Sequence, residues 1–274
     1  MKYSMTQWIF GGEPLEETLQ RLKRMGFDGI ELIPEPERFP DTREARALFD
    51  KYGIEPSMMD LTPFHDLSHP DESERKKAIE INKKMLDITS EIGCGKMLVC
   101  GTAVGRTCAV GTYGEEWRLG VESVRLLADY AAATGVLFVM EVINHYETCL
   151  FYNVDRALRF MAEVDHDNVA IMIDTYHMNI EEDDSCRAIR RVADKLANFH
   201  VADSNRCGVG RGHIDFLPIM KTLKAVGYDD YIGLEPQAPG PNPFESIKAP
   251  NSKETVEGYL ETSIDLLRTI EAAV

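Results

Sequence analysis

The stretch that decides the fold is residues 168–182, "NVAIMIDTYHMNIEE". Its apolar run at 169–173 is typical of a buried strand. The run ends in Asp174, and His177 follows before Glu181 and Glu182. An acid at this point either caps the helix that follows or belongs to a ligand site at the end of the strand.

Similar apolar runs recur on both sides of this stretch, and helical patterns separate them. The expected strands are 3–9, 29–33, 55–61, 96–101, 137–142, 169–174, 196–202 and 231–236. The expected helices are 14–25, 42–52, 72–92, 114–134, 154–164, 185–194, 215–226 and 252–272. Several helices meet the next strand at a glycine, the residue that most easily takes the left-handed conformation ending a helix.

Regular alternation of apolar strands with helices predicts a parallel sheet covered by helices. Eight such units in 274 residues predict an α/β fold, a single (β/α)8 TIM barrel spanning residues 1–274. The alternative is a doubly wound open sheet, but its usual GxGxxG is missing from "FGGEP" at 10–14. In a barrel, the long loops at 102–113 and 236–250 lie on the C-terminal face, where active sites form.

Composition and charge limit the partners of the chain. It is 44% hydrophobic and 28% charged, with a formal net charge of −16, which repels nucleic acid and anionic membranes. Six cysteines without a CxxC pair indicate reduced thiols. Because "MKYSMTQWIFGG" is a poor signal peptide and no apolar run could cross a bilayer, we expect a cytoplasmic protein.

Four ligand-type residues stand at the ends of four successive expected strands: Glu141, Asp174, His200 and Glu235. Individually, Asp174 also suits a helix N-cap and His200 a hydrogen-bonded core histidine. Three converging carboxylates would repel one another, and one divalent cation would remove that repulsion. An oxygen-rich donor set with one imidazole suits Mn²⁺, with Co²⁺, Mg²⁺ or Zn²⁺ as alternatives.

The motifs "EVINHYE", "DTYHMNIEE", "FHVADSNR" with "GRGHIDF", and "GYDDYIGLEP" resemble the xylose isomerase-like barrel superfamily. Within it they are most similar to the D-tagatose/D-psicose 3-epimerase branch, and the resemblance is densest from 137 to 236. The resemblance implies that Glu141 and Glu235 bind the metal and act as the acid/base pair. Asp174 and His200 would be the other two ligands.

The resemblance also implies that Glu147, His177 and Arg206 hold the oxygens of a sugar substrate. His145 departs from the pattern, because epimerases often carry Arg there, and this puts contacts at the rim of the sugar in doubt. Related barrels commonly pair, so a homo-oligomer, dimer or tetramer, is expected.

The expected reaction is C3 epimerisation of a ketose through an enediolate. A cation polarises the carbonyl, one carboxylate removes the C3 proton and another returns a proton on the opposite face. The same residues would serve an aldose–ketose isomerase, an inosose dehydratase or a lyase acting on a keto sugar, including a C-glycoside. These alternatives stay open at this stage.

Other functions fit the sequence less well. Apurinic-site endonucleases share the acidic and histidine positions, but use extra histidines where this chain has Met59, Asp60 and Cys100. A Schiff-base aldolase needs a lysine at a strand's C-terminal end, whereas Lys96 begins its strand. A non-catalytic binding protein predicts at least one broken ligand position, and none is broken.

Overall fold

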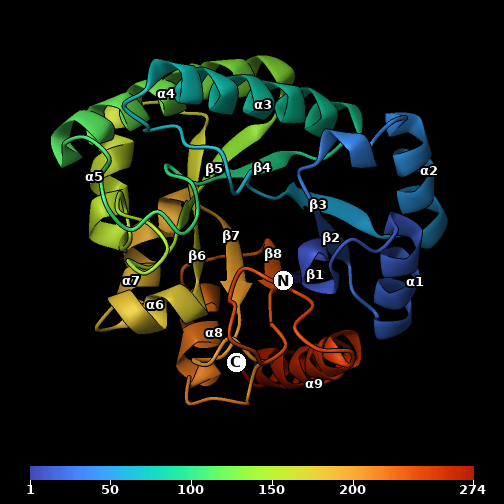
Figure 1. Ribbon diagram of the computed structural model, residues 1–274. Coiled ribbons are helices and arrows are strands. Elements are labelled where there is room, and N and C mark those ends of the chain that lie inside the picture. Colours follow the sequence, from blue (N-terminus) through green and yellow to red (C-terminus); the bar gives the residue numbers. More distant parts are fainter.

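The computed structural model describes residues 1–274 and contains a ring of eight parallel strands surrounded by helices (Figure 1). The strands are β1 (Lys2–Met5), β2 (Gly29–Leu32), β3 (Glu55–Met59), β4 (Lys96–Val99), β5 (Leu137–Val142), β6 (Val169–Asp174), β7 (Leu196–Val201) and β8 (Tyr231–Leu234). They pair in the order β1-β8-β7-β6-β5-β4-β3-β2, and a parallel bridge between Thr6 and Glu31 closes the ring. The predicted (β/α)8 barrel is confirmed.

Eight of the nine α-helices lie close to their predicted positions, whereas the short helix that follows β6 was not predicted. The nine are α1 (Leu15–Met25), α2 (Thr42–Tyr52), α3 (Glu72–Glu91), α4 (Tyr113–Thr134), α5 (Val154–Val164), α6 (Thr175–Glu181), α7 (Ser185–Val192), α8 (Phe216–Ala225) and α9 (Ser252–Ala273), with 3-10 helices η1 (Gln7–Phe10), η2 (Pro36–Arg38) and η3 (Ala193–Lys195). Gly26, Gly53 and Gly135 end their helices with positive φ, as the sequence pattern predicts.

The largest difference from the expected strands is at β1, which was expected to reach residue 9. The chain leaves the sheet after Thr6 and forms η1, which ends at Gly11 with φ 68°. The side-chain oxygen of Gln7 accepts a hydrogen bond from Ile33 N at 3.3 Å. A side-chain hydrogen bond thus takes the place of a backbone hydrogen bond between strands. The pattern of apolar residues in the sequence does not indicate such an exchange.

Alternation along the strands decides which side chains face the inside of the barrel. On β5, Phe138 and Met140 belong to the large core beneath the helices, whereas Val139 belongs to a small inner cluster. Glu141 shares the inward parity of Val139. On β6, Met172 lies in the inner cluster, so Asp174 two residues later also faces inward.

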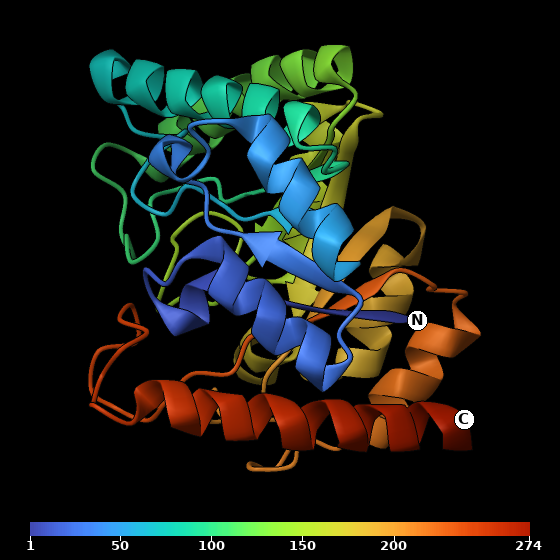
Figure 2. The same cartoon turned by 90° about the vertical axis from the view of Figure 1, so that its right-hand side faces the viewer.

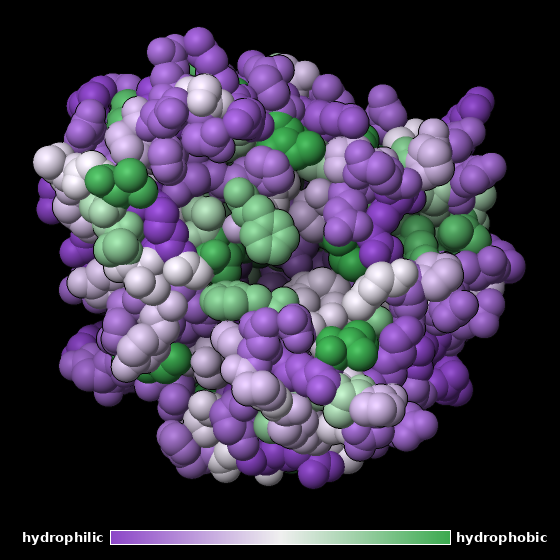
Figure 3. All heavy atoms as spheres, in the orientation of Figure 1, coloured by the Kyte–Doolittle hydropathy of each residue, from purple (hydrophilic) through white to green (hydrophobic).

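The long loops and the chain termini lie at opposite ends of the barrel. Figure 2 shows the loop after β8 at one end, and both termini at the other. Seen from the loop end, the surface is mostly hydrophilic, with a hollow near its centre that apolar atoms border (Figure 3). None of the helices combines the length and the apolar character that crossing a membrane requires.

Candidate active site

Three of the predicted ligand residues meet at the C-terminal end of the barrel. Ligand atoms of Glu141, His200 and Glu235 all lie within 4.8 Å of one another, and the three side chains are buried. Glu141 ends β5 and His200 lies near the end of β7. Glu235 follows β8 and remains attached to the sheet, because its backbone N donates to Val201 O at 3.1 Å. The strands therefore hold all three in place.

The imidazole of His200 is fixed by a carboxylate that the sequence analysis did not single out. His200 Nε2 lies 2.6 Å from Oε2 of Glu31, which is fully buried on β2. The other oxygen of Glu31 accepts hydrogen bonds from Ser4 Oγ at 2.8 Å and Asn198 Nδ2 at 3.1 Å. A carboxylate on one imidazole nitrogen keeps a proton there, so the opposite nitrogen is the one that can give up its proton to bind a metal ion.

That opposite nitrogen has no hydrogen-bond partner. His200 Nδ1 is buried and makes no hydrogen bond, although Glu235 Oε2 lies 3.5 Å away. A buried polar atom without a partner is costly, and it is rare in folded proteins. A divalent cation between this nitrogen and the two glutamates would satisfy all of them, so the donor set fits a metal ion.

Asp174 has both of the features that the sequence left as alternatives. Its Oδ1 accepts from Tyr176 N at 2.8 Å and caps α6, while Oδ2 accepts from Arg206 Nη1 at 2.9 Å. The structure does not bring Asp174 into the three-residue group, and its place as a fourth ligand stays a prediction. Arg206 Nη2 also donates to Glu235 Oε2 at 2.5 Å, so one guanidinium bridges two of the acids.

The remaining predicted substrate residues border the same space. His177 Nδ1 lies 2.7 Å from Asn144 Nδ2, and its Nε2 lies 3.8 Å from Glu141 Oε1 and 3.4 Å from Arg206 Nη1. Glu147 Oε1 accepts from Asn144 Nδ2 at 2.9 Å. Asn144 thus contacts both Glu147, in the loop after β5, and His177, on α6.

The loop after β7 presents Arg206 in an unusual backbone conformation. Its φ of 61° lies in the left-handed region, which few non-glycine residues occupy. Its backbone is held by a bond from Arg206 N to Asp203 O and by one from Gln237 N to Arg206 O at 2.7 Å. The guanidinium lies 4.7 Å from the centre of the Tyr176 ring. These contacts hold the guanidinium of Arg206 next to the carboxylates of Asp174 and Glu235.

Burial and neighbouring charges shift the pKa values of Glu141 and Glu235 in opposite directions. Burial, and next the nearby Glu235, raise the pKa of Glu141 well above its usual range. For Glu235 burial acts in the same direction, but Arg206 and His200 outweigh it and lower its pKa to about 2. Burial would lower the pKa of His200, yet Glu31 and Glu235 raise it well above its ordinary value. In the metal-free protein, the raised pKa values of Glu141 and His200 favour their protonated forms, while the lowered pKa of Glu235 keeps it ionised.

Trp8 and Asp60 also belong to the surroundings of the site. The Trp8 indole N–H donates to Glu235 Oε1 at 2.6 Å, so this residue does more than pack. Asp60 is buried after β3, and its carboxylate accepts a hydrogen bond only from Leu61 N, at 2.7 Å. Burial, together with Glu235 and Glu31, raises the pKa of Asp60 to about 8.

Glu31 could have been found by the same signal as Glu141, since each is a lone acid between apolar strand residues. Its partner His200 could not, because β2 and β7 are not neighbours in the sheet, and the two side chains meet only inside the closed barrel. Gly233 on β8 makes this contact possible. A Cβ there would lie 2.4 Å from Glu31 Oε1 and 2.7 Å from His200 Cδ2.

Comparison with known proteins gives consistent results. A profile of the family described as xylose isomerase-like TIM barrel matches residues 19–269. D-psicose 3-epimerase of Ruminiclostridium cellulolyticum is 32% identical over 231 residues, 80% of this chain and 76% of that protein. 3-dehydro-D-guloside 4-epimerase of Escherichia coli is 28% identical over 258 residues, 90% of this chain and 97% of that protein.

A solved structure extends the likeness to the whole chain. D-psicose 3-epimerase with D-tagatose from Clostridium cellulolyticum H10 matches with a TM-score of 0.88 and 25% identity, covering 99% of each chain. The chain therefore belongs to the xylose isomerase-like TIM barrel family, and its predicted resemblance to the ketose 3-epimerase branch is confirmed.

Proposed function

We propose that this protein is a metal-dependent ketose 3-epimerase. The observation that carries the proposal is the buried group of Glu141, His200 and Glu235, in which the imidazole nitrogen facing the acids lacks a partner. The named relatives add support, because a D-psicose 3-epimerase is 32% identical over most of the chain. Isomerase chemistry on a small sugar follows from both.

Glu141, Asp174, His200 and Glu235 would hold one divalent ion. Three carboxylates and one imidazole favour Mn²⁺, with Co²⁺, Mg²⁺ or Zn²⁺ as alternatives. When bound, the ion supplies Lewis acidity, which makes a proton next to a carbonyl easier to remove. Asp174 would have to exchange its contact with Arg206 for the ion, and it keeps its helix-capping bond through the other oxygen.

Glu141 and Glu235 would act as the acid/base pair. They come from β5 and from the end of β8, which are separated by β6 and β7, so they approach the mouth of the barrel from different sides. One removes the C3 proton from one face of the sugar, and the other returns a proton to the opposite face. Trp8 keeps one oxygen of Glu235 in a fixed position.

Glu147, His177 and Arg206 would hold the oxygens of the sugar. Arginine carries only donors and cannot ligate a cation, so Arg206 suits hydroxyl or carbonyl oxygens. Burial lowers the pKa of His177 well below its usual value, with Arg206 adding to the effect, so its ring is neutral and can donate or accept. Glu147 accepts from hydroxyl groups when ionised.

A second candidate is 4-epimerisation of a keto-glycoside. It is supported by the Escherichia coli relative named 3-dehydro-D-guloside 4-epimerase, 97% of which is covered. The same pair of glutamates would act on a neighbouring carbon. Aldose–ketose isomerisation, dehydration of an inosose and lyase reactions would use the same proton abstraction, and they differ in their products.

The location and assembly of the enzyme are further parts of the proposal. All six cysteines are free, which supports a cytoplasmic protein with reduced thiols. Phe244 and Ile247 are exposed on the loop after β8, and they support contact with a second copy in a homo-oligomer.

The test is conversion of free ketoses by the purified protein. Fructose, psicose, tagatose, ribulose and xylulose are incubated with Mn²⁺-loaded and with chelator-treated protein, and the products are separated by chromatography. We expect the C3 epimer of at least one ketose with Mn²⁺, and none after chelation. Glu122→Gln, an exposed change on α4, is the control that should match wild type. Formation of an aldose, a lighter product or no product by fully loaded protein rejects the 3-epimerase assignment.

A further inference from the structure

A cavity lies on the same face of the barrel, outside the metal-binding group. It has a volume of about 280 Å³ and is lined by Gln7, Pro14, Leu15, Arg38 and Phe39. These residues come from the segments that follow β1 and β2, which places the cavity on the C-terminal face. Its volume is just below the usual range of ligand pockets, roughly 300–1,000 Å³, so it suits one ring rather than a whole large ligand.

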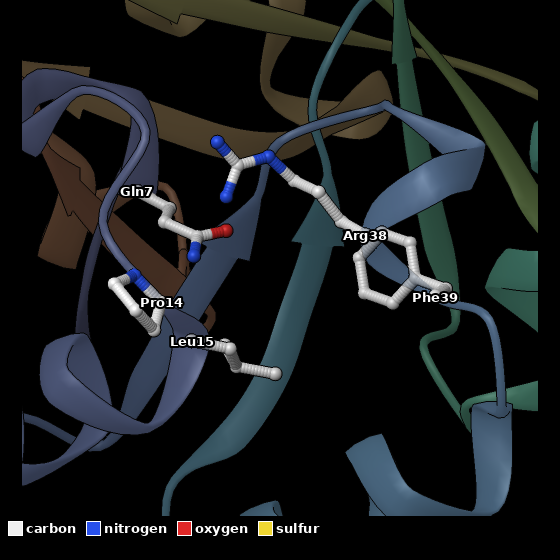
Figure 4. A pocket seen from close by; sticks show the side chains of 5 residues that line it. All are labelled: Gln7, Pro14, Leu15, Arg38 and Phe39. Atoms are coloured by element: carbon white, nitrogen blue, oxygen red, sulfur yellow. The ribbon is translucent and has the colours of Figure 1, made fainter.

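Two hydrogen-bond donors in this cavity have no partner within the chain. Gln7 is 2% exposed, and its oxygen accepts from Ile33 N, but its amide nitrogen makes no hydrogen bond. Arg38 donates from Nε to Glu35 Oε2 at 2.7 Å and from Nη1 to Glu13 O at 3.3 Å, while Nη2 makes none. Figure 4 shows both side chains pointing toward the same space, with Pro14, Leu15 and Phe39 around it.

The charges around the cavity favour a neutral ligand. The guanidinium of Arg38 is already paired with Glu35, and the chain carries a formal net charge of −16. A phosphate or carboxylate would therefore meet a cation whose charge is largely compensated. Hydroxyl groups need only the free N–H donors, and the apolar atoms of Leu15 and Phe39 suit the C–H face of a sugar ring.

The cavity is connected to the metal-binding group by short segments of chain. Gln7 directly precedes Trp8, which donates to Glu235. Ile33, which donates to Gln7, lies two residues after Glu31, the partner of His200. The cavity therefore borders the two chain segments that carry Trp8 and Glu31, on the same face of the barrel as the metal-binding group.

We propose that this cavity is a second sugar subsite, which binds a neutral, hydroxyl-bearing ring linked to the reacting keto sugar. The inference rests on the proposed function and specifies its substrate class: a glycosylated ketose or a keto-glycoside is preferred over a free hexulose. Gln7 and Arg38 are then specificity-determining residues, and they take no part in proton transfer.

The test compares disaccharide and monosaccharide binding to metal-loaded protein by calorimetry. Maltulose and isomaltulose carry a glucosyl ring on the ketose, and fructose is the unsubstituted reference. We expect at least one disaccharide to bind about tenfold more tightly than fructose, equivalent to about 1.4 kcal/mol. Arg38→Met keeps the aliphatic stem, and it should abolish this preference. Arg43→Met, at an arginine that is 87% exposed on α2, is the matched control and should keep it.

Binding affinity is read separately from product formation, so the subsite can fail while the 3-epimerase assignment stands, and the reverse. Equal binding of both disaccharides and fructose to wild type overturns the subsite. An unchanged preference for the disaccharide in Arg38→Met also overturns it. So does a third result, in which wild type binds fructose 6-phosphate more tightly than fructose, Arg38→Met loses that preference, and neither disaccharide binds more tightly than fructose. Gln7→Met is a second variant with the same expected loss, and circular dichroism checks that each variant is folded.

Discussion

Replacing Glu31 by glutamine tests how the protein prepares His200 for a metal ion. Ser4 Oγ and Asn198 Nδ2 donate to Oε1 of Glu31, so an amide at this position keeps its carbonyl oxygen there. Its NH2 group then faces His200 Nε2, where Oε2 now lies at 2.6 Å. The imidazole would have to accept at Nε2 and carry its proton on Nδ1, the atom that a metal needs unprotonated.

The expected magnitude follows from the lost contact. Changing the residue that orients a histidine ligand typically lowers metal affinity about 10–100-fold, or about 1.4–2.8 kcal/mol. This agrees with the roughly 1.5–3 kcal/mol of a hydrogen bond to a charged group. Isothermal calorimetry with Mn²⁺ measures the affinity, and nitrogen-15 shifts of the imidazole report which nitrogen carries the proton.

Glu13→Gln is the matched control for this variant. Glu13 is also a buried glutamate, but it pairs with Arg21 and Lys253 instead of a histidine. Its replacement should lower the melting temperature and leave Mn²⁺ affinity unchanged. If Glu31→Gln binds Mn²⁺ within twofold of wild type, or if its His200 keeps the proton on Nε2, the proposed role of Glu31 is wrong.

Three other changes probe the same centre. Gly233→Ala should reduce Mn²⁺ affinity, because its Cβ would collide with Glu31 and His200; calorimetry showing wild-type affinity would contradict this. Arg206→Ala should raise KM for the ketose while metal analysis still finds one ion per chain, since arginine is a donor only; loss of the ion with unchanged KM would reverse the assignment. Asp60 has a folded-state pKa of about 8, against about 3.9 in unfolded chains. Between these two pH values the folded state binds more protons than the unfolded state, so the stability of the metal-free protein should fall as pH rises toward 8. In Asp60→Asn, the melting temperature should decline less over this pH range. An equal decline would show that Asp60 does not cause the pH dependence.

Much of the fold follows from local patterns in the sequence. Apolar runs between helical patterns predicted all eight strands, and glycines after helices predicted where several helices end. The extent of β1 was overestimated because "QWIF" at 7–10 is apolar enough for a strand but forms η1. The side-chain bond from Gln7 to the segment after β2 decides this, and it depends on a contact between distant residues.

The candidate site was predictable where a residue type is unusual for its position. Glu141 and Glu235 stand out as acids in apolar strands, and alternation brings them inside the barrel. Asp174 could not be resolved from sequence, because one oxygen caps α6 while the other faces Arg206. The pairing of Glu31 with His200 was not predictable, because His200 lies 169 residues later and meets Glu31 only when the ring closes.

The most direct test of the account follows deuterium at C3 of the ketose in D₂O, using Mn²⁺-loaded wild type, Glu141→Gln and Glu235→Gln. Wild type should convert the ketose and place deuterium at C3 of the product, because the abstracted proton exchanges with solvent on a glutamate. An amide can still contact the ion but cannot take a proton. Each variant should therefore fail to epimerise, yet exchange the C3 proton of the one epimer that its remaining glutamate deprotonates, a different epimer for each variant. Label at C1, C2 or C4, substantial turnover by either variant, or exchange of the same epimer by both would contradict a two-glutamate C3 epimerase.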